Sequence, residues 1–128
     1  RLVEKYSIYP NITWLGHVDA LEFYSSIDIL VVTSIWAEPL PRVIYEAMSQ
    51  GVAVLATDVG GNPEIMTGDL SAFLYSPGDI EMLVKKYNML RNMMTNEFSS
   101  RLIVESRKYS SENVSDKYLE IYKELSND

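Results

Sequence analysis

The feature that most constrains this chain is the alternation of short aliphatic runs with helical patterns. Residues 29–33 and 52–57 are almost wholly aliphatic or β-branched, which is typical of parallel strands that are covered on both faces. Between them, apolar side chains recur at helical spacing from about Pro41, and Gly51 supplies a stop. Strand, helix and strand in this order predict an α/β fold with a parallel sheet.

Weaker patterns complete the expected domain. Shorter strands are expected over residues 12–15 and 72–75, which gives a parallel sheet of about four strands with flanking helices. Further helices are expected over residues 20–26, after Gly60-Gly61, from a cap at Asp79, over 97–108 and from a cap at Ser110 or Ser111. The last of these carries Tyr118 and Tyr122 on an apolar stripe, and we expect that stripe to pack in the core.

Length and composition indicate one partial domain over residues 1–128. The chain opens with what reads as the last turn of a helix, residues 2–6, so we expect a piece of something longer. A net charge of −7 disfavours nucleic acid as a partner, because phosphate-backbone contact needs clustered Lys and Arg. There are no cysteines, and no apolar run approaches the roughly 18–20 residues of a membrane span. No metal-binding motif is present, so we expect no metal.

Two glutamates, Glu38 and Glu46, stand eight positions apart around the start of the helix that follows residues 29–33. Ligands bind at the carboxyl ends of strands in open α/β sheets, and a helix N-terminus there offers N–H groups to a phosphate. The two prolines of this segment have no N–H. The amides left to face an anion are those of Leu40, Arg42 and Val43. We expect both carboxylates and the helix tip to converge on one pocket at this rim.

Simpler interpretations of the same residues stay open. Arg42 and Glu46 are four apart and could form an ion pair on a solvated helix face. Glu38 could merely complement the helix dipole. Gly60-Gly61 could be no more than a turn that needs a positive φ. His17, the only histidine of the chain, is expected to be a surface or packing residue before it is a catalytic base.

These residues carry a resemblance to a known family. Glu38 and Glu46 match the E-x7-E motif of retaining glycosyltransferases, and the surrounding sequence resembles family 4 of the GT-B fold. The matching segments, in the same order as in the family, are residues 14–16, 27–34, 38–51, 52–57, 60–64 and 77–79. The resemblance covers roughly residues 10–125. The bare motif is a weak signal, whereas the ordered set is specific.

The resemblance implies the Rossmann-like C-terminal, donor-binding domain of such an enzyme. Glu38 would contact the transferred sugar as the catalytic-site residue, and Glu46 would accept hydrogen bonds from the ribose hydroxyls. The amides of the helix tip would approach the diphosphate, although Pro41 replaces a common glycine and removes one amide. The implied flanking loops are Gly16-His17-Val18 beside the base and Gly60-Gly61 on the donor side of the cleft.

The resemblance also implies what lies outside this chain. The donor would be a UDP-, GDP- or ADP-sugar, with no cofactor, and an N-terminal acceptor domain and a basic Arg/Lys pair would be missing. In the family's strand order, 3-2-1-4-5-6, two strands between residues 12–15 and 29–33 are absent. Either these segments pair directly, or an open apolar edge favours self-association. We expect the isolated chain to be inactive and the parent to be cytoplasmic, peripheral at the inner face of the membrane through the absent domain.

Two other functions fit the same residues. One is a different enzyme on the same fold, such as a nucleotide-sugar epimerase. The other is a non-catalytic α/β binding or scaffold module whose glutamates are surface charge.

Overall fold

The computed structural model describes Lys5 and residues 9–126, so most of the expected helical turn over residues 2–6 lies outside it. Three parallel strands form one sheet in the order β1 (Ile29–Val32), β2 (Ala53–Thr57) and β3 (Leu74–Tyr75). Ile29 pairs with Ala53 at one end of β1, and Thr57 pairs with Tyr75 at the end of β2. The predicted α/β class and parallel sheet are confirmed.

The fourth strand expected over residues 12–15 is not formed. These residues are extended but exposed, and they make no ladder with β1. A strand needs a neighbour for its backbone groups, and within residues 9–126 no strand pairs with this segment. Within residues 9–126 the outer edge of β1 has no partner strand either, so the two segments do not pair directly. The strand expected over residues 72–75 begins only at Leu74, because Gly68–Phe73 forms a 3₁₀ helix, η1.

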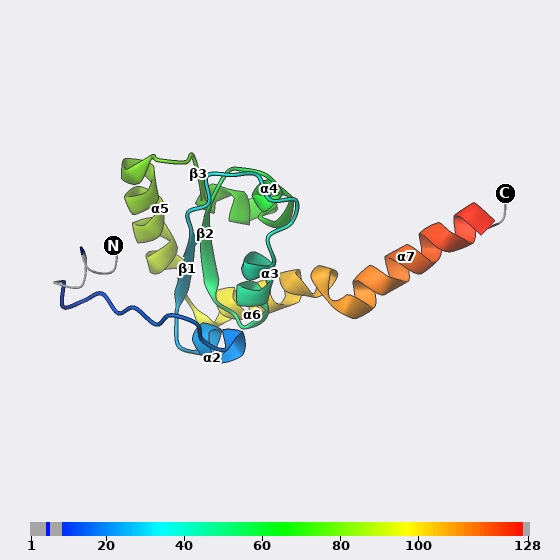
Figure 1. The fold of residues 1–128 in the computed structure, drawn as a ribbon, viewed down its shortest axis with the longest axis horizontal. Coiled ribbons are helices and arrows are strands. Elements are labelled where there is room, and N and C mark those ends of the chain that lie inside the picture. Colours follow the sequence, from blue (N-terminus) through cyan, green and yellow to red (C-terminus); the bar gives the residue numbers. More distant parts are fainter. Residues whose placement is uncertain (1–4, 6–8, 127–128) are drawn as a thin grey trace.

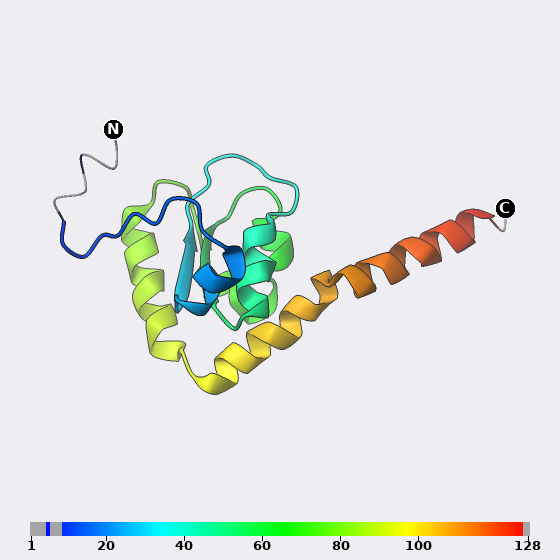
Figure 2. The same ribbon diagram turned by 60° about the horizontal axis from the view of Figure 1, so that its bottom comes forward.

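Helices cover both faces of the sheet. Helix α5 (Ile80–Met93) lies on one side, and α3 (Arg42–Ser49) lies on the other with α6 (Asn96–Ser106) packed against it (Figures 1 and 2). The capping pattern that predicted α5 is present, since the Asp79 carboxylate accepts from the Met82 amide. Each helix is too short or too polar to span a bilayer in the part of the chain that is described.

The core lies around β2. All five residues of β2 are buried, as its continuous aliphatic sequence predicts for a strand covered on both faces. From α3, Ile44, Ala47 and Met48 pack against it, and α6 contributes Phe98 and Leu102. Two short helices flank this body, α2 (Ala20–Ser25) before β1 and α4 (Asn62–Ile65) after β2.

The last helix, α7 (Ser111–Ser126), projects away from the body (Figures 1 and 2). It follows the 3₁₀ turn η2 (Arg107–Tyr109), and none of its residues is buried. The expectation that its tyrosine stripe is core is wrong: Tyr122 is 65% exposed. The helical period was read correctly, but no other element within the described residues lies where the stripe could be buried.

Candidate functional site

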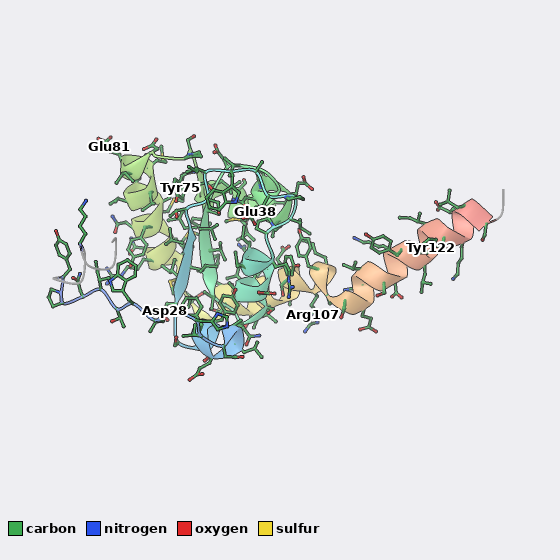
Figure 3. The ribbon with its side chains drawn as sticks, in the orientation of Figure 1. Asp28, Glu38, Tyr75, Glu81, Arg107 and Tyr122 are labelled. Atoms are coloured by element: carbon green, nitrogen blue, oxygen red, sulfur yellow. The ribbon has the colours of Figure 1, made fainter. Side chains whose placement is uncertain are left out.

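The loop between β1 and α3, residues 33–41, lies at the carboxyl edge of the sheet and carries Glu38 (Figure 3). Two hydrogen bonds from the neighbouring strand-to-helix connection hold its backbone. The Thr57 hydroxyl donates to the Ser34 carbonyl oxygen at 2.7 Å, and the Gly61 amide donates to the Glu38 carbonyl oxygen at 2.8 Å. The loop that carries Glu38 is therefore held at two points, at Ser34 near its start and at Glu38 itself.

The Gly60-Gly61 turn touches this loop because neither residue has a side chain. A Cβ on Gly60 would stand 2.5 Å from the Glu38 carbonyl oxygen, and one on Gly61 would stand 1.9 Å from that of Pro39. Gly60 has a positive φ of 55°, as the turn interpretation expects. Gly61 has a φ of −83°, so close approach of two backbones is what requires glycine there.

Two buried polar residues that the sequence analysis did not single out support the same contact. Thr57 and Asn62 are both nearly inaccessible. The Asn62 side-chain amide donates to the Thr57 carbonyl oxygen at 2.8 Å. Two sequence signals could have identified them: Thr57 is a polar residue at the end of an aliphatic strand, and Asn62 directly follows two glycines. Their role here is to hold the rim in place.

The tip of α3 is uncapped. Pro41 precedes the helix in an extended conformation, and no side chain accepts from the first-turn amides. Within residues 9–126 no hydrogen bond is made by the backbone N–H groups of Leu40, Arg42 or Val43. The Ile44 amide is the first to bond, to the Pro41 carbonyl oxygen at 3.2 Å. These three donors remain available to an anion, with the helix dipole behind them.

Glu38 and Glu46 are each held by a neighbour. The Trp36 indole N–H donates to Glu38 Oε1 at 2.8 Å. Arg42 donates to Glu46 Oε1 from Nε at 3.1 Å and from a terminal nitrogen at 2.8 Å, so the expected i,i+4 ion pair is formed. The Tyr24 hydroxyl donates to Glu46 Oε2 at a longer 3.4 Å.

These contacts perturb two of the groups. Burial raises the pKa of the Tyr24 hydroxyl, and the Glu46 carboxylate beside it raises it further. The hydrogen bond and charge of Glu46 raise the pKa of Arg42 as well. Both shifts show that Glu46 is surrounded by donors that stay protonated at neutral pH.

Glu46 lies in the second turn of α3 and contacts Tyr24, whereas Glu38 lies in the loop before the helix, and the expectation that both carboxylates face one pocket stays a prediction. Helix α3 descends from the carboxyl edge toward the start of β2, and Glu46 lies in its second turn. Its partner Tyr24 is at the end of α2, which leads directly into the start of β1. A helix rises about 1.5 Å per residue, so Glu46 lies about 6 Å along α3 from Arg42, and Glu38 lies in the loop before the helix.

The Gly16-His17-Val18 loop lies next to α2. Asp19 caps α2 by accepting from the Leu21 and Glu22 amides, both at 3.0 Å. His17 and Val18 line a pocket of about 440 Å³ together with Leu15, Asp19, Glu22, Phe23 and Ser26. Glu46 lines a different hollow, which it shares with residues of α6 and η2.

The family of group 1 glycosyl transferases matches residues 1–113. The chain belongs to this family. Protein CapJ of Staphylococcus aureus is similar to this chain: the two are 28% identical over 139 residues, which cover the whole chain and 34% of CapJ. A sulfoquinovosyl transferase of Arabidopsis thaliana is 41% identical over 70 residues, or 52% of this chain and 14% of that protein. The chain spans about a third or less of the length of the curated relatives that it matches.

Solved structures agree with the fold. A glycosyltransferase from Rickettsia africae superposes with a TM-score of 0.77 at 25% identity, covering 97% of this chain and 34% of that one. The Anabaena protein HepE, solved with UDP-glucose, superposes with a TM-score of 0.68 at 23% identity, covering 98% of this chain and 35% of that one.

Within the described residues, no group of three or more His, Cys, Asp or Glu side chains is arranged to hold a metal ion.

Proposed function

We propose that this chain is the donor-binding part of a retaining, family 4 type glycosyltransferase. The parent enzyme moves a sugar from a nucleotide diphosphate sugar to a glycan, lipid or small acceptor. Glycosyl transfer is the role typical of the family. The retaining mechanism, the donor class and the acceptor classes are our inference from the site.

The observation that carries the proposal is the uncapped tip of α3 between two carboxylates. Two first-turn amides, of Arg42 and Val43, and the Leu40 amide just before the helix are without a partner among the described residues, and the dipole of α3 favours negative charge at this point. A nucleotide diphosphate sugar has an anionic centre with hydroxyl-bearing rings on either side. The amides suit the diphosphate, and the glutamates suit the hydroxyls, since a carboxylate only accepts hydrogen bonds.

We infer the direction of the donor from the order of these groups, which runs from the loop at the rim to the second turn of α3. Glu38 at the rim receives the transferred sugar, and Glu46 in the second turn receives the ribose hydroxyls. The base then lies over the pocket formed by His17, Val18 and Phe23. HepE, which shares the fold, has been solved with UDP-glucose, and this supports a UDP-sugar before a GDP- or ADP-sugar.

Transfer itself needs groups that this chain does not present at the tip of α3. The departing diphosphate must be stabilised by positive charge, but the Arg42 guanidinium is held along the helix by Glu46. We propose that an acceptor domain and a basic Arg/Lys pair are supplied by other parts of a full-length protein, so that the isolated chain is inactive. The cytoplasm, with peripheral contact to the inner face of the membrane, is the proposed location.

Calorimetric titration with UDP, GDP and ADP tests the proposal. We expect the folded chain to bind one of them, and Glu46→Gln to weaken binding about tenfold, as expected when hydrogen bonds to a charged acceptor lose its charge. Glu120→Gln on α7 is the matched control, because it removes the same charge at an exposed position away from the sheet.

The alternatives predict other outcomes. If a properly folded chain binds none of the three nucleotides, the scaffold interpretation is favoured and the proposal fails. If the full-length protein converts a nucleotide sugar without any acceptor, it is an epimerase.

A further inference from the structure

Trp36 has an environment that folding does not explain. It lies in the loop between β1 and α3 and is 61% exposed, so its large ring adds little to the core. Its neighbour Ile35 is 72% exposed. The indole N–H nevertheless makes a well-formed hydrogen bond, 2.8 Å to Glu38 Oε1.

The loop backbone on either side of Trp36 is anchored independently of the ring. Ser34 is held by the Thr57 hydroxyl, and the Glu38 carbonyl is held by the Gly61 amide. These bonds fix the position of the Glu38 backbone. They leave the side-chain torsions of Glu38 undetermined, and the only side-chain partner that the described residues give its carboxylate is Trp36.

We propose that Trp36 is a positioning residue for Glu38, and this inference depends on the proposed function. An indole N–H is a donor only, so it can bond to a carboxylate oxygen but cannot turn round to accept from it. A bond from N–H to a carboxylate at this distance is charge-assisted and among the stronger ones. With Oε1 occupied, Oε2 is presented to a hydroxyl of the donor sugar. Trp36 therefore contributes to recognition of the sugar and not of the nucleotide.

The test compares UDP with UDP-glucose on the full-length protein. Trp36→Phe keeps an aromatic ring and removes the N–H. We expect it to weaken UDP-glucose binding about tenfold, as for loss of a hydrogen bond to a charged group, while the affinity for UDP stays unchanged. Ile35→Ala, in the same loop and with greater exposure, is the control and should change neither affinity.

A double-mutant cycle separates positioning from a general structural role. If Trp36 acts through Glu38, Trp36→Phe has no further effect on UDP-glucose binding in a Glu38→Ala background, which has no acceptor for the indole N–H. An equal loss of UDP and UDP-glucose binding in Trp36→Phe, or an additive loss in the double variant, overturns the inference while leaving the proposed function intact. If the wild-type protein binds none of UDP, GDP and ADP, the proposed function and this inference are both wrong.

Discussion

The loop at the rim of the sheet and helix α7 differ in what holds them. The loop, residues 33–41, has no regular structure and much of its surface is exposed, yet Thr57 and Gly61 hold it at two points and the Gly60-Gly61 turn packs against its backbone. Helix α7 is regular over its whole length, and none of its residues is buried. Regular secondary structure and tertiary fixation are thus separate properties in this protein. The loop is placed by contacts from a segment about 20 residues further along the chain.

The largest expected effect is at the contact between the two rim segments. Gly61→Ala places a Cβ 1.9 Å from the Pro39 carbonyl oxygen, so one backbone has to move. Overpacking typically costs about 1–3 kcal/mol, and we expect the free energy of unfolding, measured by urea denaturation, to fall by about 3 kcal/mol or more. Gly68→Ala is the matched control: its φ is +58°, but nothing lies within 4 Å of the added atom, so only backbone strain of about 1–2 kcal/mol applies. Equal losses in the two variants would show that the rim contact is not tight.

The second effect concerns the anchor at Ser34. Thr57→Val keeps the shape of the side chain and removes the hydroxyl that donates to the Ser34 carbonyl oxygen. We expect a loss of about 1–3 kcal/mol in the free energy of unfolding, because a partly buried acceptor loses its partner. Thr67→Val, at an exposed position where no side-chain bond is made to η1, should be close to neutral. A neutral Thr57→Val would mean that the loop is held by Gly61 alone.

A smaller effect is expected at alkaline pH from Tyr75, which is buried at the end of β3. Burial raises the pKa of its hydroxyl above the ordinary value. The unfolded chain then releases this proton first, so the stabilising contribution is complete below about pH 10 and is lost as the pH rises further. We expect the stability of Tyr75→Phe to decline less steeply above pH 10 than that of wild type. The measurement is urea denaturation across this range, and parallel curves would contradict the assignment.

The smallest effect is expected on α7. Tyr122→Ser and Leu125→Ser should each change the free energy of unfolding by no more than about 0.5 kcal/mol, because both side chains are exposed. Ile44→Ala on α3, at a fully buried position, should cost about 2–5 kcal/mol in the same assay. A loss above about 1 kcal/mol for Leu125→Ser would show that α7 packs against the body in solution, and the contrast with the rim would disappear.

The sequence was most informative where local patterns suffice. Continuous aliphatic runs predicted both strands β1 and β2, and the cap at Asp79 and the apolar period predicted α5. Only β2 is covered on both faces as expected, because β1 is the edge strand within the described residues and Val31 is exposed. The i,i+4 pair of Arg42 and Glu46 followed from spacing alone. The strand over residues 12–15 could not be judged in this way, because its existence depends on a partner for its backbone groups.

By itself, the amino-acid sequence determined the α/β class, the order of the elements and the carboxylates and amides offered by α3 and its preceding loop. These depend on residue period, capping and proline, which act over a few neighbouring residues. The tertiary structure alone decided that Gly61 serves close packing, that Trp36 donates to Glu38, and that Tyr24 of α2 donates to Glu46. Such contacts depend on which segments, far apart in the sequence, come within a few ångströms of each other in the fold. A pattern over a few neighbouring residues does not predict this.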